Sequence, residues 1–248
     1  MRKEGQQMSL YNKNDPNSIQ KMFGSIATQY DRTNAILSLQ MHKYWNRQLI
    51  RTTLEKKAPH TYLDLCCGTG EISLGYLKNC SSPCHAYLLD FCPEMLSCAR
   101  KRAITLNTSQ HKITYVQADA QDIPLSKETI DCITMAYGIR NIPQPNKCFI
   151  EIYRLLKNGG KVGILELTQP ANPILKAGHR LYLNTVIPLM GKLITSNRDA
   201  YQYLCNSIQS FVQPKELKEM LAGIGFKNII VKPLMGGIAT IIVAEKVS

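Results

Sequence analysis

The sequence predicts a single α/β domain built around a doubly wound, mostly parallel sheet, and two observations support this prediction. From residue 61 to residue 166, short apolar strands alternate with helical stretches, which is the pattern of parallel strands joined by crossover helices. The chain has 248 residues, of which 44% are hydrophobic and 19% are charged. This length and composition are typical of one globular domain with its own core.

The spacing of apolar residues predicts the first two thirds of the fold in order. Residues 1–57 are expected to form a helical arm, because Ile19, Met22, Phe23 and Ile26 recur at helical spacing. The strands expected in the core are 61–65, 85–90, 113–117, 130–136 and 160–166. Helices are expected between them near 71–79, 93–106 and 145–157.

The last third is expected to add a helical insertion and a closing hairpin. Residues 167–213 include an apolar stretch, 172–196, with a helical period that Pro188 interrupts. A helix near 214–224 and two strands, 227–232 and 238–245, follow, and the short link between these strands favours an antiparallel hairpin. We therefore expect 61–166 to be the ligand-binding core, 167–213 to form a lid, and 214–248 to close the single domain 1–248.

Charge is distributed unevenly along the chain, whose net charge is +12. Ten Lys and Arg face four Asp and Glu in residues 1–60, and nine face four in residues 167–248, whereas residues 61–166 carry eleven against ten. Basic flanks around a near-neutral centre suggest contact with an anionic surface, either membrane headgroups or RNA. Solvated helix faces would give the same count.

Hydrophobic runs and cysteines indicate the cellular compartment in which the protein is expected. No apolar run approaches the ~18 residues that span a bilayer, and the first seven residues are polar, so we expect a cytoplasmic protein without a secretory signal. The nine cysteines include no Cys-x-x-Cys pair. We therefore expect reduced, mostly buried thiols and no metal site.

The strongest local signal is a strand that runs into a turn of small residues and then into a helix, with the sequence Tyr62-Leu63-Asp64-Leu65-Cys66-Cys67-Gly68-Thr69-Gly70-Glu71-Ile72. Small residues let a ligand approach the backbone closely, and the helix start offers free N–H groups. The next strand ends in Asp90, twenty residues beyond Gly70, where a carboxylate can hold both hydroxyls of a ribose. The pattern predicts a nucleoside ligand bound by Asp64, Gly68, Thr69, Gly70 and Asp90.

NAD and S-adenosylmethionine both contain a nucleoside, and Asp64 is the residue that best discriminates between these two possible ligands. This acid lies inside the first strand and would face a cationic amino acid group better than a pyrophosphate, which favours the methyl donor, unless Asp64 is a buried acid that caps the following loop. After the third strand, Asp119 is placed to accept a hydrogen bond from the adenine amino group, with Ala120 beside it, unless Asp119 caps a turn. The motif order in residues 61–166 resembles the class I methyltransferases, which implies their Rossmann-like sheet but little about the acceptor.

Two further segments resemble a narrower family. They are Tyr30-Asp31-Arg32-Thr33-Asn34 in the helical arm and Tyr137-Gly138-Ile139-Arg140-Asn141 after the fourth strand. Both are similar to the ubiquinone/menaquinone biosynthesis C-methyltransferases, and the likeness extends along nearly the whole chain. It implies methylation of a ring carbon of a polyprenylated quinol by S-adenosylmethionine, with demethylmenaquinol as the expected acceptor and a benzoquinol as the alternative. The chain departs from the family at Cys66-Cys67, where members often carry Ala-Gly, and at Ala136, where they often carry Ser.

The resemblance implies roles for three side chains. Methylation of a ring carbon needs an electron-rich ring, which the phenolate form of a quinol supplies. Arg140 does not deprotonate in proteins but can stabilise that phenolate, Asn141 can orient the same oxygen, and Tyr30 can contact the ring or shape the donor pocket. A structural ion pair for Arg140 and aromatic packing for Tyr30 are the alternatives. His42 could serve as a base, although a helix-start or packing role is favoured.

The expected acceptor also predicts partners. A polyprenyl quinol stays in the bilayer, so residues 172–196 and the basic arm are expected to rest on an anionic membrane as a peripheral lid. A homodimer is compatible with the sequence. The charge raises an RNA methyltransferase as a rival, but the Asn/Asp-Pro-Pro-aromatic tetrad of such enzymes is absent after the fourth strand, so no nucleic-acid partner is expected. A binding module without catalysis is disfavoured by Asp64, Gly68, Gly70 and Asp90.

Overall fold

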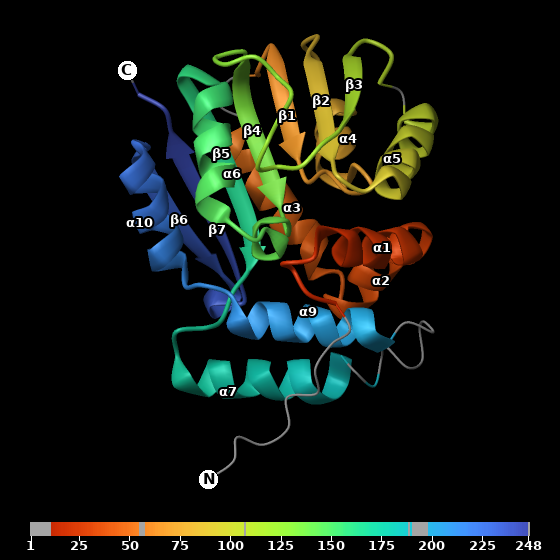
Figure 1. Cartoon of the computed structure of the whole chain (residues 1–248), viewed down its shortest axis with the longest axis vertical. Helices are drawn as coiled ribbons and strands as arrows, with labels where there is room; N and C mark the ends of the chain where they lie inside the picture. Colours follow the sequence, from red (N-terminus) through yellow and green to blue (C-terminus); the bar gives the residue numbers. More distant parts are fainter. Residues whose placement is uncertain (1–10, 55–57, 107, 188, 190–197, 248) are drawn as a thin grey trace.

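The computed structural model describes residues 11–54, 58–106, 108–187, 189 and 198–247, and a seven-stranded sheet lies at its centre (Figure 1). The strands are β1 (Thr61–Leu65), β2 (His85–Asp90), β3 (Lys112–Gln117), β4 (Ile130–Ala136), β5 (Leu156–Leu167), β6 (Lys227–Leu234) and β7 (Ala239–Glu245). Their order across the sheet is β3-β2-β1-β4-β5-β7-β6. Strands β1 to β5 pair in parallel, whereas β7 runs antiparallel to both β5 and β6. The predicted mostly parallel sheet with an antiparallel C-terminal hairpin is confirmed.

The strand order reverses at β1, which pairs with β2 on one side and β4 on the other. Asp64 of β1 is opposite Leu88 of β2 and Thr134 of β4. In open α/β sheets, a crevice forms outside the carboxyl ends of the strands at such a reversal. The small-residue turn that follows β1 therefore lies where these folds bind ligands.

Helices cover both faces of the sheet because successive strand residues point to opposite sides. On one face, α6 (Pro145–Leu155) and α10 (Pro214–Ile224) bury Phe149 and Leu221 against β4 and β5. On the other, α4 (Glu71–Leu77) and α5 (Pro93–Thr105) bury Leu74 and Leu96 against β1 and β2. Burial stabilises each such side chain by about 1.5–3 kcal/mol, so these helices hold the strand ends in place.

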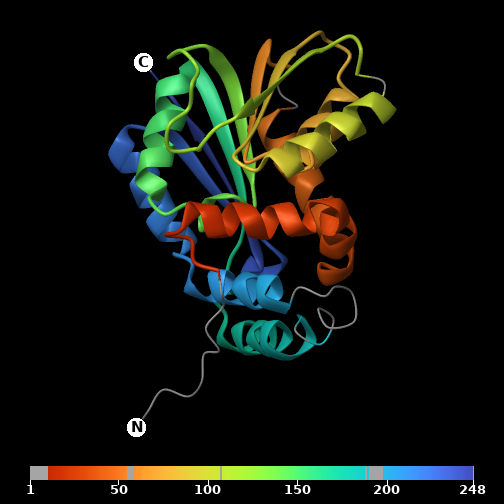
Figure 2. The ribbon, with the colours of Figure 1, turned by 45° about the vertical axis from the view of Figure 1, so that its right-hand side comes forward.

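The described part of the N-terminal arm, residues 11–54, is mainly helical, as the sequence predicts, and the rest of the expected arm 1–57 lies outside the described residues. It consists of α1 (Pro16–Ile26), a 3-10 turn, η1 (Ala27–Gln29), α2 (Tyr30–Leu37) and α3 (Met41–Thr53). Asp15 caps α1 by accepting a hydrogen bond from the backbone N–H of Ser18. Helix α3 packs closely on β5, where a Cβ atom on Gly163 would overlap Oγ1 of Thr53. Helices α1 and α2 lie across the carboxyl ends of the strands in both views (Figures 1 and 2).

The insertion between β5 and β6 contributes α7 (Pro173–Leu181), a π-helical turn, η3 (Tyr182–Val186), and α9 (Arg198–Ser210). In both views α9 lies between α7 and the N-terminal arm, on the same side of the sheet as the strand ends (Figures 1 and 2). The interruption predicted at Pro188 lies outside the described residues. Within the part of the chain that the structure describes, no helix has the length and apolar content needed to cross a bilayer.

The predicted boundaries between the helix near 145–157 and the strand 160–166 are wrong. Helix α6 ends at Leu155, earlier than the expected 157, and β5 begins at Leu156 instead of residue 160. The reason is a contact across the sheet: Leu156 pairs with Ile130 before a bulge shifts the β4–β5 register. Strand β5 therefore begins directly after α6 and runs to its carboxyl end, where the site lies.

Candidate active site

The turn after β1 brings backbone, not side chains, to the site. Gly68 and Gly70 have φ angles of +54° and +76°, and Cys66 adopts +57°, a left-handed conformation that glycine reaches without strain. A Cβ atom on Gly68 would meet no atom within 4 Å, so the loop borders open space there. Gly70 immediately precedes α4, and Asp64 accepts a hydrogen bond from the N–H of Ser73 in the first turn of that helix. The turn can therefore cradle a ligand.

Asp90, at the end of β2, is tied to this turn. Its Oδ2 accepts a hydrogen bond from the N–H of Gly68 at 2.8 Å, and its Oδ1 accepts one from the N–H of Cys92 at 2.9 Å. Burial raises the pKa of Asp90 to about 6. An ionised carboxylate has about four acceptor positions, so two remain for ligand hydroxyls.

Asp90 shares a small cavity of about 90 Å³ with Asp119, Ala120, Gly68 and Tyr30. Asp119 is exposed and accepts hydrogen bonds from the backbone and side-chain N–H groups of Gln121. That geometry is the turn cap which the sequence left as an alternative, and Asp119 still lines the cavity. The structure therefore brings Asp90, Asp119 and Ala120 to one place.

Asp64 lies beneath the turn and is only 1% exposed. Its Oδ1 accepts a hydrogen bond from Oγ1 of Thr134 at 2.9 Å, and its Oδ2 accepts one from the N–H of Ser73 at 3.2 Å. Burial raises the pKa of Asp64 to about 6. The residue lines a second, larger cavity, and its bond to the N–H of Ser73 at the start of α4 is the loop cap that the sequence left as an alternative.

Thr69 has a partner that the sequence did not predict. Its hydroxyl donates to Oδ1 of Asp31 at 2.6 Å, and Asp31 also forms an ion pair with Arg102 of α5. This network links helix α2 of the arm to the glycine turn. Asp31 belongs to the Tyr-Asp-Arg element that the sequence singles out, whereas nothing in the sequence marks Arg102.

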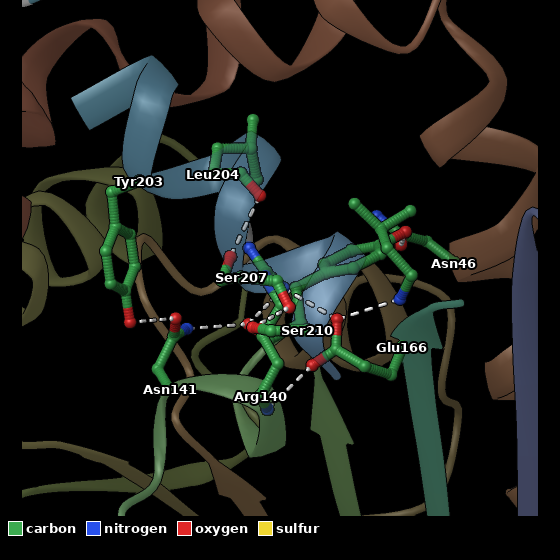
Figure 3. A network of polar contacts seen from close by, with 10 residues as sticks. Asn46, Arg140, Asn141, Glu166, Tyr203, Leu204, Ser207 and Ser210 are labelled. Carbon is green, nitrogen blue, oxygen red and sulfur yellow. Dashed lines mark hydrogen bonds and ion pairs between the residues drawn. The ribbon is translucent and has the colours of Figure 1, made fainter. Parts of the chain in front are cut away.

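Arg140 follows β4 and is buried in an ion pair (Figure 3). Its Nη1 lies 2.6 Å from Oε1 of Glu166 and donates to the carbonyl of Tyr137 at 2.7 Å, while its backbone N–H donates to Oε2 of Glu166. Among the described residues, Nε of Arg140 is buried without a hydrogen-bond partner. The pair fixes the guanidinium in one orientation, and Arg140 also lines the larger cavity.

Asn141 is held between the fourth strand and the insertion. Its Nδ2 donates to the carbonyl of Tyr137 at 3.2 Å, and its Oδ1 accepts a hydrogen bond from the hydroxyl of Tyr203 on α9 at 3.0 Å (Figure 3). Asn141 lines the small cavity, and Arg140 lines the large one. The predicted neighbours therefore face different cavities, and Tyr203 is a positioning contact that the sequence alone did not reveal.

Tyr30 lines both cavities. Burial raises the pKa of its hydroxyl, and the positive charge of Arg140 opposes that shift. Its ring meets Phe23 edge to face, with the ring centres 6.2 Å apart. Both predicted roles, aromatic packing and shaping of the pocket, are compatible with this position.

The larger cavity has a volume of about 450 Å³ and is lined mainly by apolar side chains of the arm, the insertion and the β6–β7 turn. It meets the small cavity at Gly68, Cys66 and Tyr30, which line both. Four of its lining residues are large, apolar and exposed: Leu39, Ile174, Leu175 and Met235. They come from three separate segments, and together they form an apolar rim.

No group of three or more potential metal ligands occurs among the described residues. Acids, glycine backbone and an apolar cavity therefore make up the described site. These features suit a nucleoside with a cationic end next to a hydrophobic acceptor.

The fold and this arrangement together define the class of protein, a domain with the fold of class I methyltransferases. Phosphoethanolamine N-methyltransferase 2 of Haemonchus contortus, solved with S-adenosylhomocysteine, superposes with a TM-score of 0.61 at 15% identity over 82% of this chain and 52% of that one. An S-adenosylmethionine-dependent methyltransferase of Aquifex aeolicus gives a TM-score of 0.57 at 16% identity over 82% of this chain and 89% of that one.

Sequence similarity identifies the family. The chain belongs to the ubiE/COQ5 methyltransferase family, whose model matches residues 10–246. It is 52% identical to the demethylmenaquinone methyltransferase of Protochlamydia amoebophila over 96% of this chain and 99% of that protein. It is 37% identical to the protein of the same name from Lactobacillus johnsonii over 96% of this chain and 97% of that one. The resemblance drawn from the sequence is confirmed.

Proposed function

We propose that this methyltransferase transfers a methyl group from S-adenosylmethionine to a ring carbon of demethylmenaquinol. One observation carries the proposal: a small cavity lined by acids and glycine backbone meets a large apolar cavity at the turn after β1. Such a pair of cavities suits a polar donor beside a hydrophobic acceptor. The names of the relatives at 52% and 37% identity favour demethylmenaquinol over a benzoquinol.

The residues present fit the donor. Asp90 keeps free acceptor positions for ribose hydroxyls, Gly68 leaves open space beside its backbone, and Asp64 presents negative charge to the cationic end. When bound, the donor supplies a methyl group activated by the positive charge on its sulfur. The chain holds donor and acceptor in line, which is the main requirement of methyl transfer.

The acceptor-side roles are assigned to the large cavity. Arg140, oriented by Glu166, stabilises negative charge on the quinol oxygen with its guanidinium charge. Tyr30 shapes the junction between donor and ring, and Asn141 fixes the loop that carries Arg140 through its bonds to Tyr137 and Tyr203. Residues 61–166 would then bind the donor, and 167–213 would cover the acceptor.

The apolar rim explains how a polyprenylated molecule reaches the cavity. Ile174 and Leu175 lie on α7, where Lys176 and Arg180 are also exposed. Exposed apolar side chains flanked by positive charge are typical of surfaces that rest on anionic bilayers. We therefore place the rim at the membrane, with the prenyl tail leaving through it.

A methyl-transfer assay tests the proposed function. The full-length chain is incubated with labelled S-adenosylmethionine and vesicles that contain demethylmenaquinol, a demethylated benzoquinol, or no quinol, and with total RNA in parallel. Mass spectrometry should find one added methyl on the naphthoquinol ring. Label in RNA, or transfer to the benzoquinol alone, would contradict the proposed acceptor, and no transfer to any of them would contradict the enzyme assignment.

A further inference from the structure

A quinol ring reacts readily as its phenolate, so some group must take the hydroxyl proton. We propose that His42 of α3 is that proton acceptor, held in a single tautomer by Ser38 and supported by the carboxylate of Glu71. This inference rests on the proposed function and deepens it. His42 lines the large cavity together with Arg140 and Tyr30, although it belongs to the N-terminal arm and not to the donor-binding core.

A chain of hydrogen bonds fixes the tautomer. The hydroxyl of Ser38 lies 2.6 Å from the carbonyl oxygen of Asn34 and 2.7 Å from Nδ1 of His42. A carbonyl can only accept, so the single hydroxyl proton of Ser38 points to Asn34, and Nδ1 must carry a proton that it donates to Ser38. The neutral ring therefore has its lone pair on Nε2, the nitrogen free to act as a base.

Glu71 is placed to stabilise the protonated ring. Its Oε1 lies 3.4 Å from Nε2 of His42, longer than an ordinary N–H···O hydrogen bond but within strong Coulomb range. Burial raises the pKa of Glu71, but contact with His42 and the charges of Arg102 and Lys43 outweigh it and hold that pKa below its ordinary value. The carboxylate thus stays ionised and attracts a proton to Nε2.

The phenols and the guanidinium in the same cavity are unsuited to the task. Burial raises the pKa values of Tyr30, Tyr137 and Tyr182, so these hydroxyls keep their protons at neutral pH. Arg140 is permanently charged and paired with Glu166.

The remaining ionisable groups that line the cavity are Asp64, Glu71, His179 and the thiols of Cys66 and Cys67, and burial raises the pKa of both thiols. Both oxygens of Asp64 already accept hydrogen bonds beneath the turn. Burial lowers the pKa of His179, which makes that imidazole a weaker base than an exposed one and a suitable control.

The quinol O–H proton moves to Nε2 of His42, and the ring carbon of the resulting phenolate forms a bond to the methyl carbon while the S–CH₃ electron pair stays on sulfur. The methylated ring carbon then loses its own proton to water, which restores the aromatic phenolate. His42 returns its proton to that oxygen, so the net release is one proton for each methyl transferred.

The test is the pH dependence of turnover at saturating donor. In the pH–rate profile of the wild type, the rate should rise with pH along an ascending limb set by an imidazole. His42→Gln should remove that limb and lower the rate at neutral pH by about 10²-fold or more. His179→Gln, the matched control, should keep the limb. Glu71→Gln, which is less buried, should keep the fold and shift the limb to lower pH, an effect that a purely structural role would not produce.

Donor affinity and substrate range separate the outcomes. Calorimetry should show unchanged donor affinity for His42→Gln. A weaker donor affinity with an intact limb would make His42 a donor contact and overturn the inference, as would loss of the limb in His179→Gln instead. An unmoved limb in Glu71→Gln would also overturn it. Wild-type protein that methylates no quinol would overturn the proposed function as well, whereas wild-type transfer with an unchanged limb in His42→Gln would overturn this inference alone.

Discussion

Two buried carboxyl groups, Asp64 and Asp90, each have a pKa of about 6 against an ordinary value of 3.8. Their raised values have opposite consequences for stability and for binding. Because both acids hold protons more tightly in the folded chain, their contribution to stability is present below pH 3.8 and is lost as the pH rises to about 6. Donor binding, in contrast, needs them ionised.

The donor affinity should therefore fall about a hundredfold between pH 7 and pH 5, because protonation of each of the two required carboxylates weakens binding about tenfold over that interval. Calorimetry at the two pH values measures this change. Asp90→Ala should bind the donor much more weakly at both pH values. Asp122 is an exposed acid outside both cavities, so Asp122→Ala should match the wild type. Equal affinity of Asp90→Ala and wild type would remove Asp90 from the site.

Arg140→Ala should cut turnover by roughly 10²-fold or more while donor affinity stays intact, as the loss of an oxyanion donor does. Arg140→Lys should rescue only part, because a point charge lacks the planar fork. The deficit should shrink at high pH, where the quinol ionises without help, and the imidazole limb should remain. Wild-type turnover in a folded variant would leave Arg140 a purely structural residue.

The ion pair complicates this experiment and suggests its control. Removing Arg140 leaves Glu166 buried without its cation, and breaking such a pair typically costs about 3–5 kcal/mol. The double variant Arg140→Ala, Glu166→Gln removes the stranded charge. It should recover thermal stability but not turnover, which separates the chemical role from the structural one.

At the scale of elements, α7 should determine membrane binding. Ile174 on α7 and Ile104 on α5 are 82% and 85% exposed, so they are a matched pair in different places. Ile174→Glu should lower recovery with anionic vesicles in flotation by about tenfold, since burial of such a side chain contributes about 1.5–3 kcal/mol. Ile104→Glu should float like the wild type, and salt should weaken binding of both. Equal recovery of the two variants would place the membrane contact elsewhere.

The contact of α3 with β5 gives a prediction about packing. Gly163→Ala would push a methyl group into Thr53, and overpacking of this kind destabilises by about 1–3 kcal/mol. Gly75→Ala on α4 meets nothing within 4 Å and should be neutral or stabilising, because alanine favours helix. Thermal unfolding of both variants measures the difference, and an unchanged midpoint for Gly163→Ala would show that α3 can shift away.

At the scale of the whole molecule, the sequence predicts what depends on neighbours along the chain. Strand and helix periods locate β1 to β4, and the reversal rule places Asp64, Gly68 and Asp90 at one edge. Contacts between distant segments carry no such local signal. The pairing of Arg140 with Glu166, of Asp31 with Arg102 and of Asn141 with Tyr203 depends on how separate helices pack, which no spacing encodes.

The position of β7 also has a consequence for how the protein is made. This strand is the last to leave the ribosome, yet it lies inside the sheet, between β5 and β6. Until it is synthesised, β5 presents a bare edge of unpaired N–H and C=O groups, and such edges are templates for aggregation. A chain that ends before β7 therefore cannot seal the sheet, and synthesis of β7 becomes the event that closes the fold.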